Sequence, residues 1–256
     1  MFLTAWDIFS YNKRFIFVFT FATLVLLAST GEIYSQKKFS KSYPAEKNIR
    51  LELTNRTGTI IVKGWDKNEV NISAWLEKPI AKIVPRNLSG TILINVIRDN
   101  QDRAEVGAVN FTIYVPQNSI VDIETRIGNL EVSNINGGYV RAHISSEGDI
   151  TLLNIGAQSV SARNLIGDIF YDGMIQPGGT YRFVSTNGNI NVRIPFSSSF
   201  KLVATAPSSR NISLGSFRSS SMRFVGSGRR VIGQVGSGSA NINVTNQRGT
   251  ISFIRR

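Results

Sequence analysis

The sequence predicts an all-β protein of the β-solenoid type, in which parallel, β-helix-like coils of about 20 residues stack on one another. Two observations lead to this class. A short glycine motif recurs at a regular spacing, and the composition favours strands and turns, because the chain has 22 glycines and is rich in valine, isoleucine, threonine and asparagine. Stretches rich in alanine and leucine, which favour helices, are scarce after the first thirty residues.

The repeated motif is Gly-x-(Ile/Leu). It begins at Gly58, Gly128, Gly148, Gly167, Gly188 and Gly249. The four central copies follow one another after 20, 19 and 21 residues. A period that persists over several copies is typical of a solenoid, because each repeat is too small to bury its apolar face alone and must stack on the next.

Each central copy contains two short strands. After the glycine the sequence alternates, as at Ile190, Val192 and Ile194, and a second strand follows about ten residues later, as at Ser159–Arg163. The repeat is therefore predicted to be strand, turn, strand, turn. We expect one interior column of neighbours about 4.8 to 5 Å apart. It consists of Leu130, Ile150, Ile169 and Ile190.

The residue after each motif glycine is Asp, Asn or Thr, and these short polar side chains can hydrogen-bond to the turn backbone. Stacked copies should align them in a ladder. The alternative is calcium binding, as in nonapeptide rolls. In four of the six copies the residue after the glycine is Asn or Thr and not an acidic residue, and the period is about twice the nine residues of a calcium-binding roll. The turn role is therefore favoured, and no metal or cofactor is predicted.

The region before the central repeats also predicts strands. Residues 49–76 show three alternating segments, and residues 109–125 show two more on either side of Pro116, which can end a strand because no ladder donor is needed there. A polar loop covers residues 99–107. No long helical pattern occurs after Gln36.

Residues 1–36 are predicted to be a signal peptide or a single N-terminal membrane anchor, and residues 37–256 the β-strand-repeat domain. An uncharged run, Phe15–Ala28, follows Lys13 and Arg14. Its 14 residues fit the apolar core of a signal peptide better than the roughly 20 residues of a spanning helix. Small residues at 28–31 suit a cleavage site, although a retained anchor stays open. Either form places the domain outside the cytoplasm.

The chain carries a net charge of +12. Residues 1–36 contain two basic and two acidic residues, so the domain keeps the whole excess. Outside the cytoplasm such a surface attracts anionic glycans, phospholipid head groups or extracellular DNA, and envelope protein partners are a further expectation. Arg229 and Arg230 are the predicted polyanion contacts. The alternative is that the charges are scattered for solubility alone.

Most catalytic chemistry is excluded by composition. The chain has no cysteine and a single histidine, His143, which removes thiolate nucleophiles, Cys-ligated metals, a lipoprotein anchor and most nucleophile–base pairs. No catalytic residue is predicted. His143 is expected to have a surface or turn role, and Trp65 to pack over a hairpin rather than stack on a sugar.

A carbohydrate-active β-helix enzyme remains an alternative, because such hydrolases use two carboxylates about 5 to 9 Å apart. The candidates are Glu147, Asp149, Asp168 and Asp172. Asp149 and Asp168 occupy the turn position that asparagine fills in adjacent copies, which explains them without chemistry. The glycine-rich segment 225–242 lacks the Lys-Ser/Thr ending of a phosphate loop and is expected to form loops and strands.

Three features together resemble a known family. They are LELTNRTGTIIVKGWDKNEVNISA at 51–74, YVPQNSIVDIETRIGNLEV at 114–132, and the GDI and GNI repeats. They are similar to the bacterial β-strand-repeat family of unknown function that is labelled "putative adhesin", and Gly58–Val70 is the most specific part. The resemblance implies an exported, solenoid-like envelope domain with adhesion as a suggested role, and it offers no catalytic residues to transfer.

The sequence therefore predicts an exported, non-enzymatic envelope protein, adhesin-like or structural, that binds anionic surface polymers. A carbohydrate-active enzyme and an inert scaffold without a ligand remain as alternatives. A basic stripe on one face of the solenoid would favour the binding module, an acidic cleft with two close carboxylates the enzyme, and scattered charge the scaffold.

Overall fold

A computed structural model describes residues 37–46 and 48–256. The predicted signal peptide or anchor at residues 1–36 lies outside the described residues. The chain divides into two units, Met1–Ser35 and Gln36–Arg256, and the described residues all belong to the second. In its described part no helix has the length and apolarity to cross a membrane. Helical structure there amounts to α2 (Val96–Asp99) and the 3-10 turn η1 (Gly215–Phe217).

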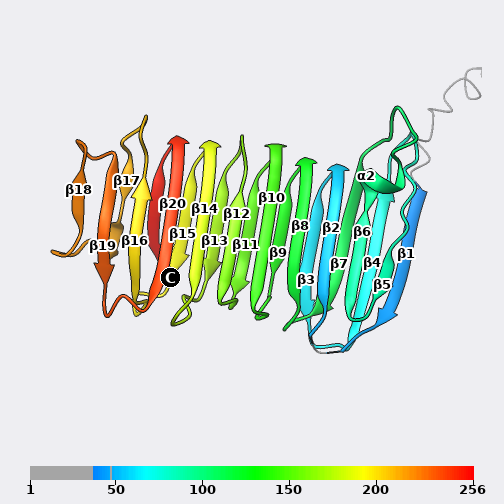
Figure 1. The fold of residues 1–256 in the computed structure, drawn as a ribbon, viewed down its shortest axis with the longest axis horizontal. Coiled ribbons are helices and arrows are strands. Elements are labelled where there is room, and N and C mark those ends of the chain that lie inside the picture. Colours follow the sequence, from blue (N-terminus) through cyan, green and yellow to red (C-terminus); the bar gives the residue numbers. More distant parts are fainter. Residues whose placement is uncertain (1–36, 47) are drawn as a thin grey trace, which may run out of the picture. The chain divides into compact units, whose positions relative to one another are not determined.

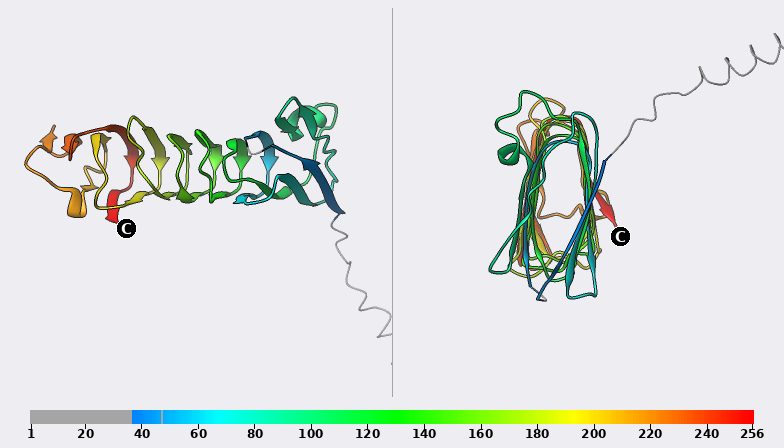
Figure 2. Two further views of the ribbon diagram at one scale, coloured as in Figure 1. Left: turned by 90° about the horizontal axis from the view of Figure 1, so that it is seen from below. Right: turned by 90° about the vertical axis from the view of Figure 1, so that its right-hand side faces the viewer.

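The strands form two sheets that face each other (Figures 1 and 2). In spatial order, sheet A contains β1 (Lys37–Pro44), β4 (Glu69–Leu76), β7 (Val109–Pro116), β3 (Ile60–Trp65), β9 (Leu130–Ser133), β11 (Ile150–Ile155), β13 (Ile169–Gly173), β15 (Ile190–Ile194), β21 (Ile251–Arg255) and β17 (Ile212–Ser213). Sheet B contains β18 (Arg223–Val225), β19 (Arg230–Val235), β16 (Phe200–Thr205), β20 (Ala240–Arg248), β14 (Thr180–Asn187), β12 (Ser159–Arg163), β10 (Tyr139–Glu147), β8 (Ile120–Ile127), β2 (Arg50–Thr57), β6 (Thr91–Asn95) and β5 (Arg86–Leu88).

Between β8 and β15 the chain alternates between the two sheets, so each coil gives one strand to each sheet and neighbouring coils pair in parallel. The architecture is all-β with two largely parallel sheets, as the sequence predicts. The expected interior column is confirmed. Ile150 pairs with Leu130 on one side and with Ile169 on the other, Ile169 pairs with Ile190, and all four side chains are buried.

The motif glycines allow the coils to approach closely at their turns. Gly148 and Gly167 have φ values of +146° and +127°, a region that L side chains rarely adopt. A Cβ on Gly167 would overlap the carbonyl group of Gly148, and one on Gly148 would overlap that of Gly128. Glycine is therefore required at these positions for backbone conformation and for packing between coils.

The predicted ladder of polar side chains is present along these turns. The Asn129 side chain accepts a hydrogen bond from the Asp149 backbone N–H at 2.9 Å, and Asp149 accepts one from the Asp168 N–H at 2.7 Å. Asp168 in turn accepts one from the Asn189 N–H at 2.6 Å. The Gly-Asp-Ile segments thus connect successive coils, which confirms the structural role expected of them.

The six motif copies are consecutive in space, although only four are regularly spaced in sequence. A Cβ on Gly128 would overlap the carbonyl of Gly58, and one on Gly249 would overlap that of Gly188. The coil of β2 and β3 therefore lies between that of β6 and β7 and that of β8 and β9. Near the other end, the last coil, β20 and β21, lies between β14–β15 and β16–β17. The end of the stack beyond the last coil is consequently built from an internal segment of the chain.

The edge of sheet A at β1 is protected against pairing with another chain. β1 pairs antiparallel with β4, carries the exposed Lys37, Lys38 and Lys41, and ends at Pro44. Charged side chains and proline on an edge strand oppose further strand addition. At the opposite end of the stack Phe200, Phe217 and Phe253 pack together, with ring centroids 5.9 to 6.4 Å apart, and close the core.

Candidate functional site

The four carboxylates considered for glycoside hydrolysis are placed by the stack. Asp149 and Asp168 each use Oδ1 to accept a backbone hydrogen bond from the next coil. Asp172 on β13 is almost buried, with Arg193 at 2.7 Å and Arg256 at 3.6 Å from its carboxylate oxygens. Glu147 lies at the end of β10. Turn hydrogen bonds and a charge cluster therefore account for the three aspartates.

His143 lies beside a carboxylate that its sequence neighbours do not reveal. Its Nδ1 is 3.5 Å from Oε2 of Glu124, which lies on the adjacent strand β8. Arg141 contacts Asp122 at 2.7 Å and Glu124 at 2.8 Å, and its guanidinium is 3.2 Å from the His143 ring nitrogen. Partial burial lowers the pKa of His143, and the nearby Arg141 and Arg163 lower it further, against the opposing effect of Glu124.

This charge cluster is balanced rather than acidic. It extends to Arg50, which pairs with Glu52 and lies 3.3 Å from Asp122. The pKa of Glu124 is lowered by Arg141 and His143, which outweigh the effect of its partial burial. A depression of about 270 Å³ adjoins the cluster between β2, β6 and β8. Each acidic group here has a cationic neighbour, which is typical of structural ion pairing.

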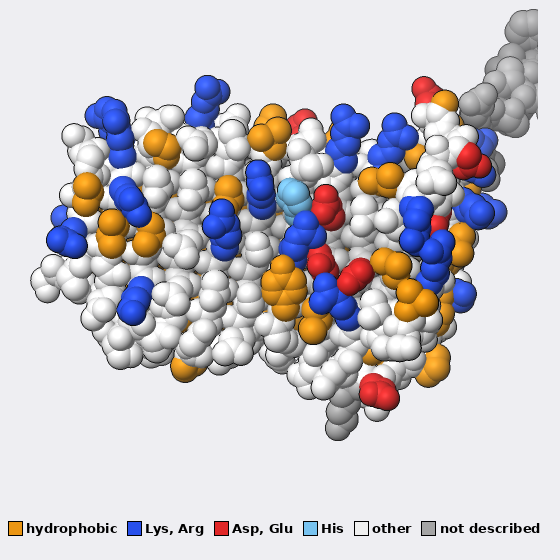
Figure 3. All heavy atoms as spheres, in the orientation of Figure 1, with side chains coloured by type: hydrophobic (Ala, Val, Ile, Leu, Met, Phe, Trp, Pro, Cys, Tyr) orange, Lys and Arg blue, Asp and Glu red, His pale blue; other side chains and the backbone are white. Residues whose placement is uncertain are grey.

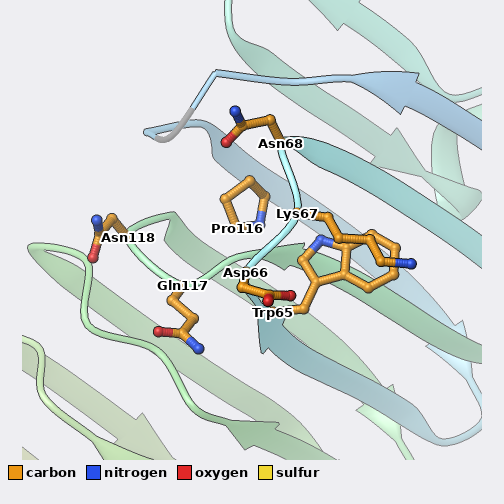
Figure 4. A pocket seen from close by; sticks show the side chains of 7 residues that line it. All are labelled: Trp65, Asp66, Lys67, Asn68, Pro116, Gln117 and Asn118. Atoms are coloured by element: carbon orange, nitrogen blue, oxygen red, sulfur yellow. The ribbon is translucent and has the colours of Figure 1, made fainter.

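A second depression, of about 210 Å³, lies at the turns after β3 and β7 (Figure 4). Its lining includes Trp65, Asp66 and Asn118. The indole of Trp65 stacks on Tyr114 with centroids 5.0 Å apart, donates its N–H to the Glu69 carbonyl at 2.8 Å, and has the Lys67 ammonium 4.9 Å from its ring. Trp65 thus has a packing role, as expected, but it packs against β7 and not over a hairpin, because β7 lies between β3 and β4. Among the described residues, no group of three His, Asp or Glu could hold a metal ion.

Arg229 and Arg230, the predicted polyanion contacts, are exposed where the β18–β19 hairpin enters β19. The preceding turn, Gly226–Gly228, has three successive positive φ values, and the segment 225–242 forms loops and strands as predicted. Arg230 pairs in register with Thr205, so its side chain lies on the outer surface of sheet B. The two arginines therefore belong to a larger exposed surface.

We define the basic face as the outer surface of sheet B from β12 to β18. Its cations are Arg163, Arg182, Lys201, Arg223, Arg229 and Arg230, and all six are exposed. In β14 and β16 these outward residues alternate with buried ones such as Tyr181 and Leu202. In Figure 3 this left-hand part of the face shows blue side chains and no red ones, whereas the acidic groups lie to the right beside the single histidine.

The net charge is concentrated in the same half of the domain. Residues 150–256 contain 12 basic and 2 acidic residues, a net +10, whereas residues 37–149 contain 15 basic and 13 acidic residues, a net +2. Both acidic residues of the C-terminal half, Asp168 and Asp172, are already engaged in the contacts described above. The basic face therefore has no carboxylate of its own to neutralise it.

Sequence reasoning identified two members of this face and missed the others. Arg229 and Arg230 are adjacent in sequence, whereas Arg163, Arg182 and Lys201 are each single basic residues in separate strands. The signal that could have found them is the distribution of the acidic residues, since the basic residues alone are spread along the chain. Strand alternation would then have placed the three on one face.

A family model described as "Toastrack DUF4097" matches residues 29–253. The chain belongs to this family. The match confirms the resemblance noted from the sequence and covers the toastrack domain from before β1 to β21. A comparison with curated proteins gives no match.

Several solved structures are similar to this toastrack domain at low sequence identity. One is titled a "putative cell adhesion protein" from Clostridium sporogenes, with 14% identity, a TM-score of 0.49, and coverage of 87% of this chain and 100% of that one. A "putative adhesin" from Bacteroides fragilis has 12% identity, a TM-score of 0.40, and coverage of 86% and 99%. A "putative lipid binding protein" from Parabacteroides distasonis has 10% identity, a TM-score of 0.36, and coverage of 85% and 94%.

Proposed function

We propose that this toastrack protein is an exported, non-enzymatic binding module that holds an anionic polymer of the cell envelope on its basic face. The observation that carries the proposal is the charge distribution, a net +10 over residues 150–256 with both acidic residues already engaged. Six exposed cations on one flat sheet surface attract polyanions, and the attraction includes the release of counterions from the polymer.

The alternatives fit the arrangement less well. A scaffold without a ligand needs its charges only for solubility, and mixed charges such as those of residues 37–149 are sufficient for that. It would not explain why residues 150–256 contain so few carboxylates. A carbohydrate-active enzyme would need two carboxylates free to act as acid and base. Asp149 and Asp168 accept backbone hydrogen bonds in the turn ladder instead, and Asp172 is held by two arginines.

An extracytoplasmic location is part of the proposal. It rests on the apolar run Phe15–Ala28 after Lys13 and Arg14, which suits a signal peptide or a retained anchor. Expression in a bacterial host with a C-terminal tag, followed by fractionation and N-terminal sequencing, tests it. We expect a chain that begins near Gly31 or Glu32, or an intact chain in the membrane fraction. A cytosolic, full-length product would contradict both forms.

The binding proposal is tested by a screen of the purified full chain at two salt concentrations. The chain is kept in a non-ionic detergent with an anionic glycan and DNA, and the detergent is removed for vesicles of anionic phospholipid. We expect binding at low salt that weakens steeply at the higher salt concentration. Arg229→Ala with Arg230→Ala should weaken it for every polyanion. The matched control is Arg56→Ala with Arg126→Ala, which removes two exposed arginines from β2 and β8 of the same sheet.

Absence of binding at low salt to every polyanion would leave the scaffold as the better account. Degradation of a polysaccharide that is lost in Asp149→Asn or Asp168→Asn would instead establish the enzyme.

A further inference from the structure

The cations of the C-terminal half are almost all arginine. Residues 150–256 contain 11 arginines and 1 lysine, whereas residues 37–149 contain 7 arginines and 8 lysines. Lysine would supply the same charge and the same solubility. The guanidinium differs from the ammonium in being a planar fork whose N–H groups match the paired oxygens of phosphate or carboxylate. Five of the six cations on the basic face are arginine, which favours recognition of an oxyanion group over charge alone.

Hydroxyl and amide side chains lie between these arginines on the outer surface of sheet B. Ser161 pairs in register with Arg182, and Arg182 with Asn243 on the next strand. Thr245 pairs with Thr205, which in turn pairs with Arg230. Arginine combined with Ser, Thr and Asn donors is the set that proteins use for phosphodiester backbones.

Most aromatic side chains in this half are buried, and the two exposed ones, Phe196 and Phe224, each have a guanidinium over the ring. Tyr181, Phe183 and Phe200 are fully buried. Phe224 on β18 is exposed, and the Arg218 guanidinium lies over its ring at 5.5 Å. On sheet A, Arg193 lies over Phe170 in the same way, at 5.4 Å. Ligands that are read by stacking need open ring faces, so a backbone of repeated charges is the better match.

We infer that the ligand of the basic face is a linear phosphodiester polymer, lying across the strands along the axis of the stack. This inference rests on the proposed function and specifies its ligand. From β12 to β18 the face crosses five strand steps, about 24 Å at the usual spacing, which is long enough for several successive phosphates. The outward residues of these strands form a flat surface, so a linear polymer fits it better than a compact ligand.

The test measures equilibrium binding of the full chain to four probes at low salt, in detergent for the soluble probes and after detergent removal for the vesicles. The first is an abasic oligonucleotide of about 20 units, which is a phosphodiester chain without bases. The others are a DNA oligonucleotide of equal length, an oligogalacturonate of equal charge, and vesicles of phosphatidylglycerol. We expect the abasic chain to bind about tenfold or more tightly than the oligogalacturonate, and the DNA to differ from the abasic chain by less than about threefold.

Two variants distinguish the contribution of the planar guanidinium geometry to binding from that of the positive charge. Arg163→Ala with Arg182→Ala should weaken binding of the abasic chain by about tenfold or more. The salt slope, which is the slope of log binding constant against log salt concentration, should become smaller by about 1.4, because two phosphate contacts are lost. Arg163→Lys with Arg182→Lys keeps the charge, so it should leave the slope unchanged and still weaken binding severalfold. The control is again Arg56→Ala with Arg126→Ala, which should change neither.

The outcomes distinguish this inference from the proposed function. Equal or tighter binding of the oligogalacturonate, full retention of affinity in the lysine variant, or binding of vesicles alone would overturn the phosphodiester polymer while leaving a polyanion-binding module in place. Binding of no probe at low salt would overturn both.

Discussion

The backbone N–H of Thr250 donates a hydrogen bond to the side-chain oxygen of Asn189 at 3.0 Å, although the two residues are 61 positions apart. This contact places the last coil of the chain, β20 and β21, inside the stack. β20 pairs with β14 on one side and with β16 on the other. The C-terminal segment thus connects the basic face to the central coils.

Truncation of the chain after Ser239 should therefore affect more than its own residues. Loss of β20 removes the common partner of β14 and β16 and exposes buried side chains on both sides. We expect the melting temperature, followed by circular dichroism, to fall by about 10 °C or more, because several kcal/mol of packing are lost. The control is deletion of the edge strand β18, residues 223–225, whose side chains are all exposed. Similar melting temperatures for the two variants would contradict the interlocked order of strands.

Gly167→Ala should destabilise the domain by about 3 kcal/mol, because the new Cβ would overlap the Gly148 carbonyl and the backbone has a positive φ. Gly138→Ala is the matched control, since nothing lies within 4 Å of a Cβ there. Chemical denaturation measures the free energy of unfolding of both variants. An equal effect of the two substitutions would show that the coils do not approach closely at the motif glycines.

Asp168→Ala should cost about 1 kcal/mol of unfolding free energy, because the Asn189 backbone N–H loses its acceptor. Asp168→Asn keeps that oxygen and should remain within about 0.5 kcal/mol of the wild type. Asparagine already occupies the equivalent ladder position at Asn129. Denaturant unfolding of the two variants distinguishes the hydrogen-bond acceptor of Asp168 from its negative charge. If the asparagine variant is as unstable as the alanine variant, the charge is responsible and not the hydrogen bond.

Acid should destabilise the domain through His143 and Glu124. The pKa of His143 is lowered in the folded state, so the unfolded chain binds more protons as the pH falls below about 6.5, and stability decreases until the folded pKa is passed. The pKa of Glu124 is also lowered, which removes stability at more acidic pH. His143→Gln should flatten the pH dependence of the melting temperature below about 6.5. An unchanged profile in this variant would exclude His143 as the group responsible.

Local regularity explains which parts of the fold could be predicted. The column of Leu130, Ile150 and Ile169 follows from alternation within a repeat and a constant period, and the ladder through Asp149 and Asp168 follows from the same spacing. The neighbours Gly58–Gly128 and Gly188–Gly249 could not be predicted, because the intervening segments break the period and no local pattern shows where they insert. Glu124 and His143, in contrast, are 19 residues apart, one period of the repeat, so the regular spacing could have shown that adjacent coils bring them together.

The site was predictable only in part. Arg229 and Arg230 are visible as a pair, but the basic face depends on which strands become neighbours in sheet B. Arg163 on β12 and Arg182 on β14 are separated by one coil of sequence and lie on adjacent strands. Asp168 and Asp172 lie between the two arginines in sequence but outside the strands of sheet B, so the absence of carboxylates between the arginines is a property of the folded surface.

The most direct test of the account is the salt dependence of polyanion binding in two charge-matched variants of the full chain. One replaces the six cations of the basic face by glutamine; the other replaces six exposed cations of the N-terminal half, namely Lys37, Arg56, Lys78, Lys82, Arg98 and Arg126. Both lose six charges, so net charge alone predicts the same result for both. The account predicts that the first variant loses binding and most of the salt slope while the second keeps both. Equal losses in the two variants would contradict it.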